Sequence, residues 1–105
     1  MKKVFAQIWE ESELGQGTKE DGCSLHLNLE TAKAYVKSIY KDRKNQKVPE
    51  AYERIVGEVF EIKISNSLYK ELLRTRFGLR IPQHAFSNLK NLGEIKFFYD
   101  DNLYY

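Results

Sequence analysis

Residues 54–64 read RIVGEVFEIKI, and large apolar side chains return at every second position along this stretch. Because the side chains of a β-strand alternate between its two faces, this pattern predicts a strand. The face expected in the core consists of Val56, Glu58, Phe60, Ile62 and Ile64. A strand with one such face has to bury it against other elements, so the flanking segments decide the architecture.

On the N-terminal side, residues 3–10 alternate in the same way and predict another strand, and residues 23–27 predict a short extended piece. Residues 29–44 carry apolar side chains at three- and four-residue steps, which is typical of an amphipathic helix. Asn28 precedes this helix as its expected N-cap. The twelve residues 11–22 contain three glycines and five charged side chains, so we expect a flexible acidic loop there.

On the C-terminal side, helical spacing predicts helices over residues 66–76 and 83–91, and alternation predicts a last strand over 94–99. The tail, residues 100–105, is expected to turn and add a short edge pair. The prediction is one α+β domain over residues 1–105, with element order β-α-β-α-(α)-β. Its sheet is mixed or antiparallel, with three to five strands and two or three helices packed on it. A right-handed crossover would make the first two strands parallel.

The composition narrows the class of protein. Of the 105 residues, 42% are apolar and 30% are charged, which excludes a disordered chain. Cys23 is the only cysteine, so no intrachain disulfide is expected, and a reducing compartment is favoured. The apolar run after Met1 is too short for a signal peptide, and no stretch reaches the roughly 20 apolar residues of a membrane span. We therefore expect a cytoplasmic, soluble protein.

Residues that could carry catalysis or a metal are few. Cys23 and His26 are an odd number of positions apart, so a strand would point them to opposite faces. A structural zinc site needs four ligands, and His84 is the only other ligand of this type. No Gly-x-Ser-x-Gly, Walker or dinucleotide-binding motif is present. We therefore predict no catalytic residue, no metal and no cofactor.

Charge is distributed unevenly along the chain, although the net charge is only +2. Residues 10–30 hold six acids against one lysine, residues 31–47 hold six bases against one acid, and residues 63–80 hold five bases against one acid. Basic side chains near aromatic rings are suited to phosphate groups and bases. The predicted ligand-binding residues are Arg74, Arg76, Arg80, Lys37, Lys41, Lys44 and Phe77. The three lysines belong to a stripe that begins at Lys33, and such a stripe is also typical of a solvated helix face.

These features favour a small non-catalytic binding or regulatory protein that recognises an anionic ligand, a nucleotide or nucleic acid. One alternative is a protein-directed inhibitor or adaptor, because 13% of the residues are aromatic and the acidic stretch resembles a phosphate backbone in charge. The predicted partner-binding residues are Trp9, Glu13, Glu20 and Asp21. A second alternative is a small ribonuclease that uses His26 or His84. An exposed edge strand near residues 94–99 permits a homodimer.

Overall fold

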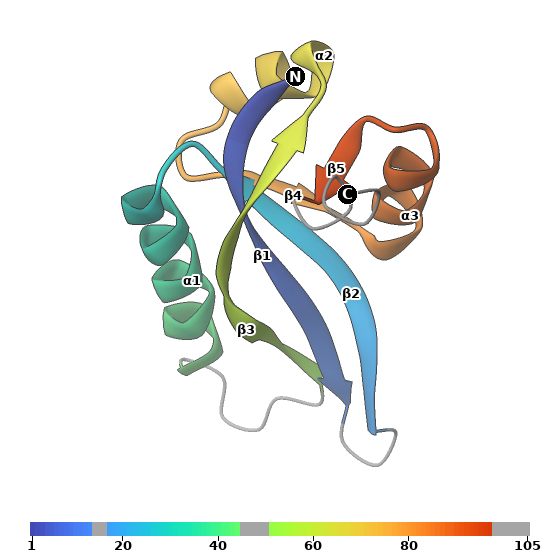
Figure 1. Cartoon of the computed structure of the whole chain (residues 1–105). Coiled ribbons are helices and arrows are strands. Elements are labelled where there is room, and N and C mark those ends of the chain that lie inside the picture. The colour runs from blue at the N-terminus through green and yellow to red at the C-terminus, as the bar shows by residue number, and fades with distance from the viewer. Residues whose placement is uncertain (14–16, 45–50, 98–105) are drawn as a thin grey trace.

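The computed structural model describes residues 1–13, 17–44 and 51–97, with side chains at all of these except 13, 42–44 and 51–53. Figure 1 shows five strands and three helices. In chain order they are β1 (Lys2–Glu13), β2 (Gly17–His26), α1 (Leu29–Lys44), β3 (Ala51–Ile64), α2 (Asn66–Leu73), β4 (Leu79–Ile81), α3 (Gln83–Asn91) and β5 (Ile95–Phe97).

The five strands form one curled sheet in the order β4-β2-β1-β3-β5. Every neighbouring pair is antiparallel, which confirms the antiparallel form of the predicted α+β sheet. The long strands β1 and β3 pair from Lys2↔Ile64 to Glu13↔Ala51. The first two predicted strands, now β1 and β3, are thus antiparallel, and the parallel crossover is wrong because β2 returns the chain before α1 begins.

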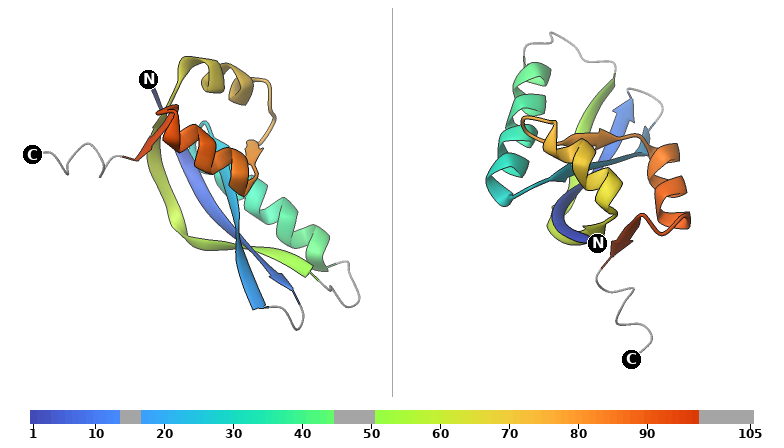
Figure 2. Two further views of the ribbon diagram at one scale, coloured as in Figure 1. Left: turned by 90° about the vertical axis from the view of Figure 1, so that its right-hand side faces the viewer. Right: turned by 90° about the horizontal axis from the view of Figure 1, so that it is seen from above.

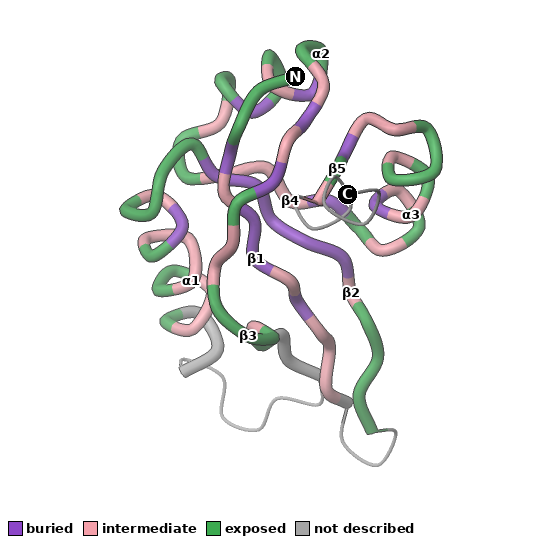
Figure 3. Tube along the Cα trace, in the orientation of Figure 1, coloured by how far each residue is buried: buried purple, intermediate pink, exposed green. Residues whose placement is uncertain are grey.

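Helices cover both faces of the sheet. In Figures 1 and 2, α1 lies against one face, while α2 and α3 lie toward the other. The main core lies between the sheet and α2 and α3. It consists of Val4, Ala6, Cys23, Leu25, Ile62, Ile64, Leu68, Leu72, Ile81, Phe86 and Ile95. The opposite face holds Trp9, Ser24 and His26, and Figure 3 shows how burial concentrates in residues 4–9 of β1 and in the C-terminal half of β2.

The predicted helices agree closely with the structure. The bounds of α1 and α3 match the predictions over 29–44 and 83–91, and α2 ends three residues before the predicted residue 76. The Asn28 side-chain oxygen accepts a hydrogen bond from the Thr31 amide at 2.9 Å, which confirms Asn28 as the N-cap of α1. No helix among the described residues is long and apolar enough to cross a membrane.

The predicted loop over residues 11–22 is largely wrong. Residues 11–13 extend β1 and residues 17–22 belong to β2, while positions 14–16 lie outside the described residues. Polar residues suit these strand ends because they are remote from the core. Strand β4 was also missed, since three residues are too few to reveal a period. Strand β5 ends at Phe97, and the predicted tail over 100–105 lies outside the described residues.

The predicted core face of β3 is correct only for its C-terminal half. Ile62 and Ile64 are buried and Phe60 packs against the core, but Val56 and Glu58 are exposed. The pairing of β1 with β3 is irregular between Ala6 and Ile8, where β3 contains more residues than β1. Gly57 lies in this extra stretch of β3 and has a φ of 71°. Such a bulge bends the strand, and the alternation in the sequence does not reveal it.

Candidate functional site

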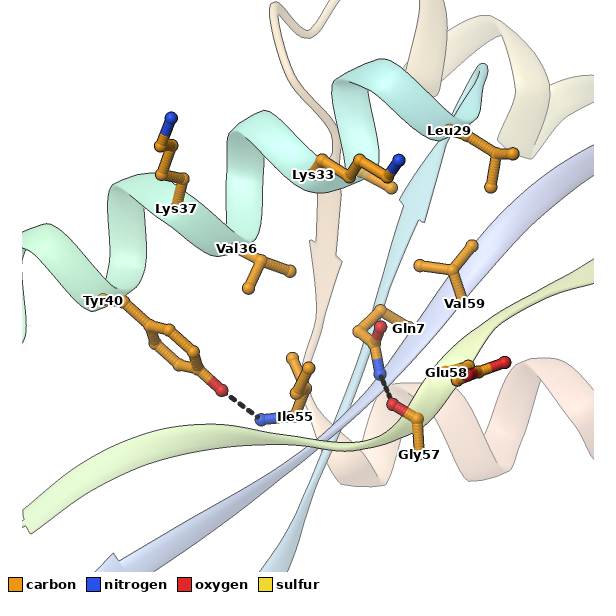
Figure 4. Close-up of a pocket in the computed structure, with 11 residues that line it drawn as sticks. Gln7, Leu29, Lys33, Val36, Lys37, Tyr40, Ile55, Gly57, Glu58 and Val59 are labelled. Carbon is orange, nitrogen blue, oxygen red and sulfur yellow. Dashed lines mark hydrogen bonds between the residues drawn. The ribbon is translucent and has the colours of Figure 1, made fainter.

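A groove of about 770 Å³ lies between α1 and the bulged part of β3 (Figure 4). It is lined by Gln7, Leu29, Ala32, Lys33, Val36, Lys37, Tyr40, Ile55, Gly57, Glu58 and Val59. Most of these side chains are apolar, and the volume lies in the usual range for small-molecule sites. We name this feature the α1–β3 groove.

Helical periodicity explains which residues of α1 reach the groove. Ala32, Val36 and Tyr40 follow one another at four-residue steps, so they lie along one face of the helix. In Figure 4 the Val36 side chain and the Tyr40 ring point toward β3. The Ile55 amide donates a hydrogen bond to the Tyr40 hydroxyl oxygen at 3.3 Å, which ties the C-terminal half of α1 to β3.

Gln7 forms the floor of the groove. Its side chain is only 1% exposed, and its amide nitrogen donates to the carbonyl oxygens of Val56 and Gly57 at 3.3 and 3.2 Å. Carbonyl oxygens only accept, so the nitrogen must face them and the side-chain oxygen must face away. Among the described residues none donates a hydrogen bond to this oxygen, and Figure 4 shows it on the side of the amide turned away from Gly57.

Charged side chains stand at the rim of the groove. Lys33 and Lys37 are one helical turn apart on α1 and both are exposed, and Glu58 is exposed on β3. Both lysines bring positive charge to the rim, and Figure 4 shows the Lys37 ammonium group pointing away from β3. The arrangement therefore combines apolar walls, one buried acceptor in the floor, and two cations and one carboxylate at the rim, which is the usual make-up of a site for a small polar ligand.

The predicted arginine cluster does not line the groove. Arg80 donates to the backbone oxygen of Asp21 at 3.0 Å and to its carboxylate at 3.2 Å, and its guanidinium lies 4.7 Å from the centre of the Trp9 ring. Arg80 therefore links β4 to β2 through its hydrogen bonds to Asp21. Arg76 lies over the Phe77 ring at 5.1 Å, and Arg74 forms the C-terminal cap of α2. The exposed Arg74, Arg76 and Phe77 stay predicted ligand contacts on a separate surface.

The three predicted lysines differ in where they lie relative to the groove. Lys37 lines the groove, Lys41 is exposed one turn further along α1, and the side chain of Lys44 lies outside the described part of the chain. Lys33 also lines the groove, although only its place in the stripe suggested a role.

The predicted partner-binding residues are mostly engaged inside the protein. Trp9 is fully buried because α1 covers the sheet face on which it lies, so it offers no surface to a partner in this structure. The Glu20 carboxylate accepts from Gln83 at 3.2 Å, and Asp21 pairs with Arg80. The side chain of Glu13 lies outside the described residues. Strand β5 is at an edge of the sheet, as the homodimer prediction requires.

A buried polar network lies under α1. The Trp9 indole N–H donates to the Ser24 hydroxyl oxygen at 2.8 Å, and Ser24 lies 2.8 Å from Nε2 of His26. The other ring nitrogen, Nδ1, is 2.7 Å from the Phe77 carbonyl oxygen, which only accepts. Nδ1 therefore carries the proton, and Nε2 accepts from Ser24. The Tyr35 ring packs 5.3 Å from the imidazole, centre to centre.

This network pairs a serine with a histidine, yet both side chains are fully buried. Burial lowers the pKa of His26, while the hydrogen bond to the Phe77 carbonyl oxygen acts in the opposite direction. His26 is therefore neutral at pH 7 and holds β2 to the segment before β4. Because no substrate can reach it in this structure, His26 is a structural residue, and the ribonuclease role predicted for it is not supported.

We expect the free energy of unfolding to fall as the pH drops from 7.5 to 5.5. The pKa of His26 is lowered in the folded state, so the unfolded chain binds more protons below the ordinary value of 6.5. The stabilisation that comes from neutral His26 is complete above pH 6.5 and decreases as the pH falls toward the pKa of His26 in the folded state. The free energy of unfolding changes by at most about 1.4 kcal/mol per pH unit in this range. Urea unfolding at several pH values measures this slope. His26→Gln is expected to flatten it, and the exposed His84→Gln is expected to leave it unchanged.

The remaining candidates for chemistry are separated. Burial raises the pKa of the Cys23 thiol to about 12, so this cysteine is an unreactive core residue at neutral pH. His26 faces α1 while Cys23 belongs to the core on the other face, and His84 is exposed on α3. Within the described ranges, no three histidine, cysteine, aspartate or glutamate side chains are close enough to hold a metal ion.

Sequence reasoning missed Gln7, Ile55 and Val59 as residues of a site. One indication was available: Gln7 interrupts an otherwise apolar strand, between Ala6 and Ile8. The bulged part of β3 that lines the groove leaves no comparable pattern. The chain matches no known family model, no curated protein and no solved structure.

Proposed function

We propose that this protein is a non-catalytic binding protein whose α1–β3 groove holds an anionic ligand with a planar, hydrogen-bonding body, a nucleotide in the simplest case. The observation that carries the proposal is Gln7. Its buried side-chain oxygen has no donor among the described residues, and a buried acceptor without a partner costs about 1–3 kcal/mol. An N–H group of a bound base would satisfy it.

The rest of the groove fits such a ligand. A base is apolar on its two flat sides and polar at its edge, so Val36, Tyr40 and Ile55 suit its faces and Gln7 suits its edge. The phosphate would lie at the rim, against the ammonium groups of Lys33 and Lys37. Lysine holds phosphate as a point charge, and two lysines one helical turn apart suit a single phosphate group.

The expected result of a titration is that adenosine and uridine monophosphates bind and perturb amide NMR signals along α1 and β3. Replacing both rim cations, in Lys33→Gln/Lys37→Gln, is expected to weaken binding at least tenfold, which is about 1.4 kcal/mol. The control is Lys41→Gln, which removes the same charge from the same helix one turn beyond the groove.

Two outcomes would contradict this function. One is that neither nucleotide perturbs the groove residues at millimolar concentration. The other is that Lys41→Gln weakens binding as much as the double variant does, since a general effect of charge would then explain it. Thermal unfolding of each variant checks that its fold is retained.

A further inference from the structure

The side-chain amide of Gln7 is held in one orientation. Its nitrogen lies 3.3 Å from the carbonyl oxygen of Ile8, 3.3 Å from that of Val56 and 3.2 Å from that of Gly57. A rotation that exchanged the nitrogen and the oxygen would place the side-chain oxygen against three groups that only accept. Because the side chain is buried, bulk solvent would not compensate for the lost hydrogen bonds.

This orientation determines what Gln7 offers to a ligand. A glutamine side chain can both donate and accept, so it ordinarily suits either kind of partner. Here the two N–H groups of the amide are taken by the three carbonyl oxygens. The side-chain oxygen is turned away from Gly57, on the side that faces α1 in the view of Figure 4. Toward the α1–β3 groove, Gln7 is therefore an acceptor only.

The irregular step between β1 and β3 supplies two of the three carbonyl oxygens. Gln7 is the single residue of β1 at this step, and residues 57–59 of β3 lie opposite it. Gly57 has a φ of 71°, in the left-handed region, and both its carbonyl oxygen and that of Val56 accept from the Gln7 amide. The orientation of the amide is thus fixed by the backbone of the fold rather than by a mobile side chain.

The two sides of the groove differ in hydrogen-bonding character. On the strand side, the Gln7 oxygen and the Glu58 carboxylate accept. On the helix side, the ammonium groups of Lys33 and Lys37 donate. A ligand that suits both sides has N–H groups at one end and an anionic group at the other. A nucleotide has this form when the edge of its base donates.

Nucleobases differ in this property at one ring position. Adenine and cytosine carry an exocyclic amino group there, which projects from the ring and provides N–H donors. Hypoxanthine and uracil carry a carbonyl oxygen at the same position, which only accepts. A carbonyl oxygen against the Gln7 oxygen would bring two acceptors together in a buried place and leave both without a donor.

We propose that the α1–β3 groove selects bases with an exocyclic amino group over their keto counterparts, and that Gln7 determines this preference. The inference rests on the proposed function, because it concerns the base of the nucleotide that the groove holds. A site that hydrogen-bonds a particular N–H group rejects an analogue without that group, since the buried atom of the site then stays unpaired.

The test compares nucleoside monophosphates that differ at this one position and share the sugar and the phosphate. In calorimetric or NMR titrations of the natural protein, we expect adenosine monophosphate to bind at least about tenfold more tightly than inosine monophosphate. Cytidine monophosphate is expected to exceed uridine monophosphate by a similar factor. Purine riboside monophosphate has only a hydrogen atom at the position, so it separates a lost donor from an added carbonyl. It is also expected to bind at least about fivefold more weakly than adenosine monophosphate.

A variant then tests the role of Gln7. Gln7→Met removes the acceptor and nearly keeps the size of the side chain, and we expect the affinity ratio within each pair to fall to about one. The matched control is Gln83→Met, because Gln83 bonds Gly22 and Glu20 away from the groove. It is expected to keep both ratios. If Gln7→Met does not fold, the purine riboside comparison with the natural protein still decides whether the donor is used.

Each failure has its own signature. Equal affinities within the pairs, or a purine riboside monophosphate that binds as tightly as adenosine monophosphate, would overturn the selection and leave nucleotide binding by the groove intact. A preference that survives in a folded Gln7→Met protein would overturn the role of Gln7. If none of the monophosphates binds at millimolar concentration, the proposed function itself fails.

Discussion

Gly22→Ala is expected to lower the free energy of unfolding by about 2–5 kcal/mol, a large part of the stability of a domain this size. Gly22 has a φ of 83°, in the left-handed region where a β-carbon costs about 1–2 kcal/mol. In addition, a β-carbon there would overlap the carbonyl oxygen of Ile81 and crowd Pro82. Displacing the backbone around such an overlap adds about 1–3 kcal/mol.

The matched control for this change is Gly17→Ala. Gly17 lies in the same strand with the same φ of 83°, but an added β-carbon would meet nothing within 4 Å. We expect this variant to lose only about 1–2 kcal/mol. Urea unfolding of the two variants separates the cost of the backbone conformation from the cost of the close approach. Equal losses would contradict the described contact between β2 and the end of β4.

The second large effect is expected at Ser24. Ser24→Ala removes the acceptor of the Trp9 indole N–H and the donor to Nε2 of His26, so two buried polar groups lose their partner. Each such group costs about 1–3 kcal/mol, and we expect a total loss of about 2–6 kcal/mol. Ser38→Ala is the control, because the Ser38 hydroxyl donates to the Tyr35 carbonyl on the exposed side of α1. It is expected to change stability by less than about 0.5 kcal/mol.

A double-mutant cycle tests whether these groups act together. Trp9→Phe removes the indole N–H, so it should cost less in the Ser24→Ala protein than in the natural one. Additive losses would mean that the hydrogen bond between Trp9 and Ser24 contributes little to stability.

Local patterns predicted much of the fold. The bounds of α1 and α3 follow from apolar side chains at helical spacing, with Asn28 before α1 and Pro82 before α3. The alternation in residues 54–64 located the C-terminal half of β3. These features depend only on residues that are close together in the chain, so a single sequence is enough to predict them.

The features that sequence reasoning missed depend on distant contacts. Residues 17–22 are polar and rich in glycine, yet they form part of β2 because residues 10–13 of β1 pair with residues 17–20 beyond an irregular step. The groove depends on the bulge near Gly57, where Gln7 donates to the carbonyl oxygens that the bulge releases from regular pairing. Trp9 was assigned to partner binding because alternation places it opposite the main apolar set and does not reveal that α1 covers its face of the sheet.

The short outer strands have a consequence for how copies of this chain behave together. Strands β4 and β5 each pair with three residues of β2 and β3, and the rest of these outer edges carries the charged residues Lys19, Glu20 and Asp21 on β2 and the bulge near Gly57 on β3. Long flat margins promote fibril growth, whereas brief ones beside charged side chains and bulges resist it. A concentrated solution of this protein is therefore expected to stay clear and free of cross-β aggregates while the chain remains folded.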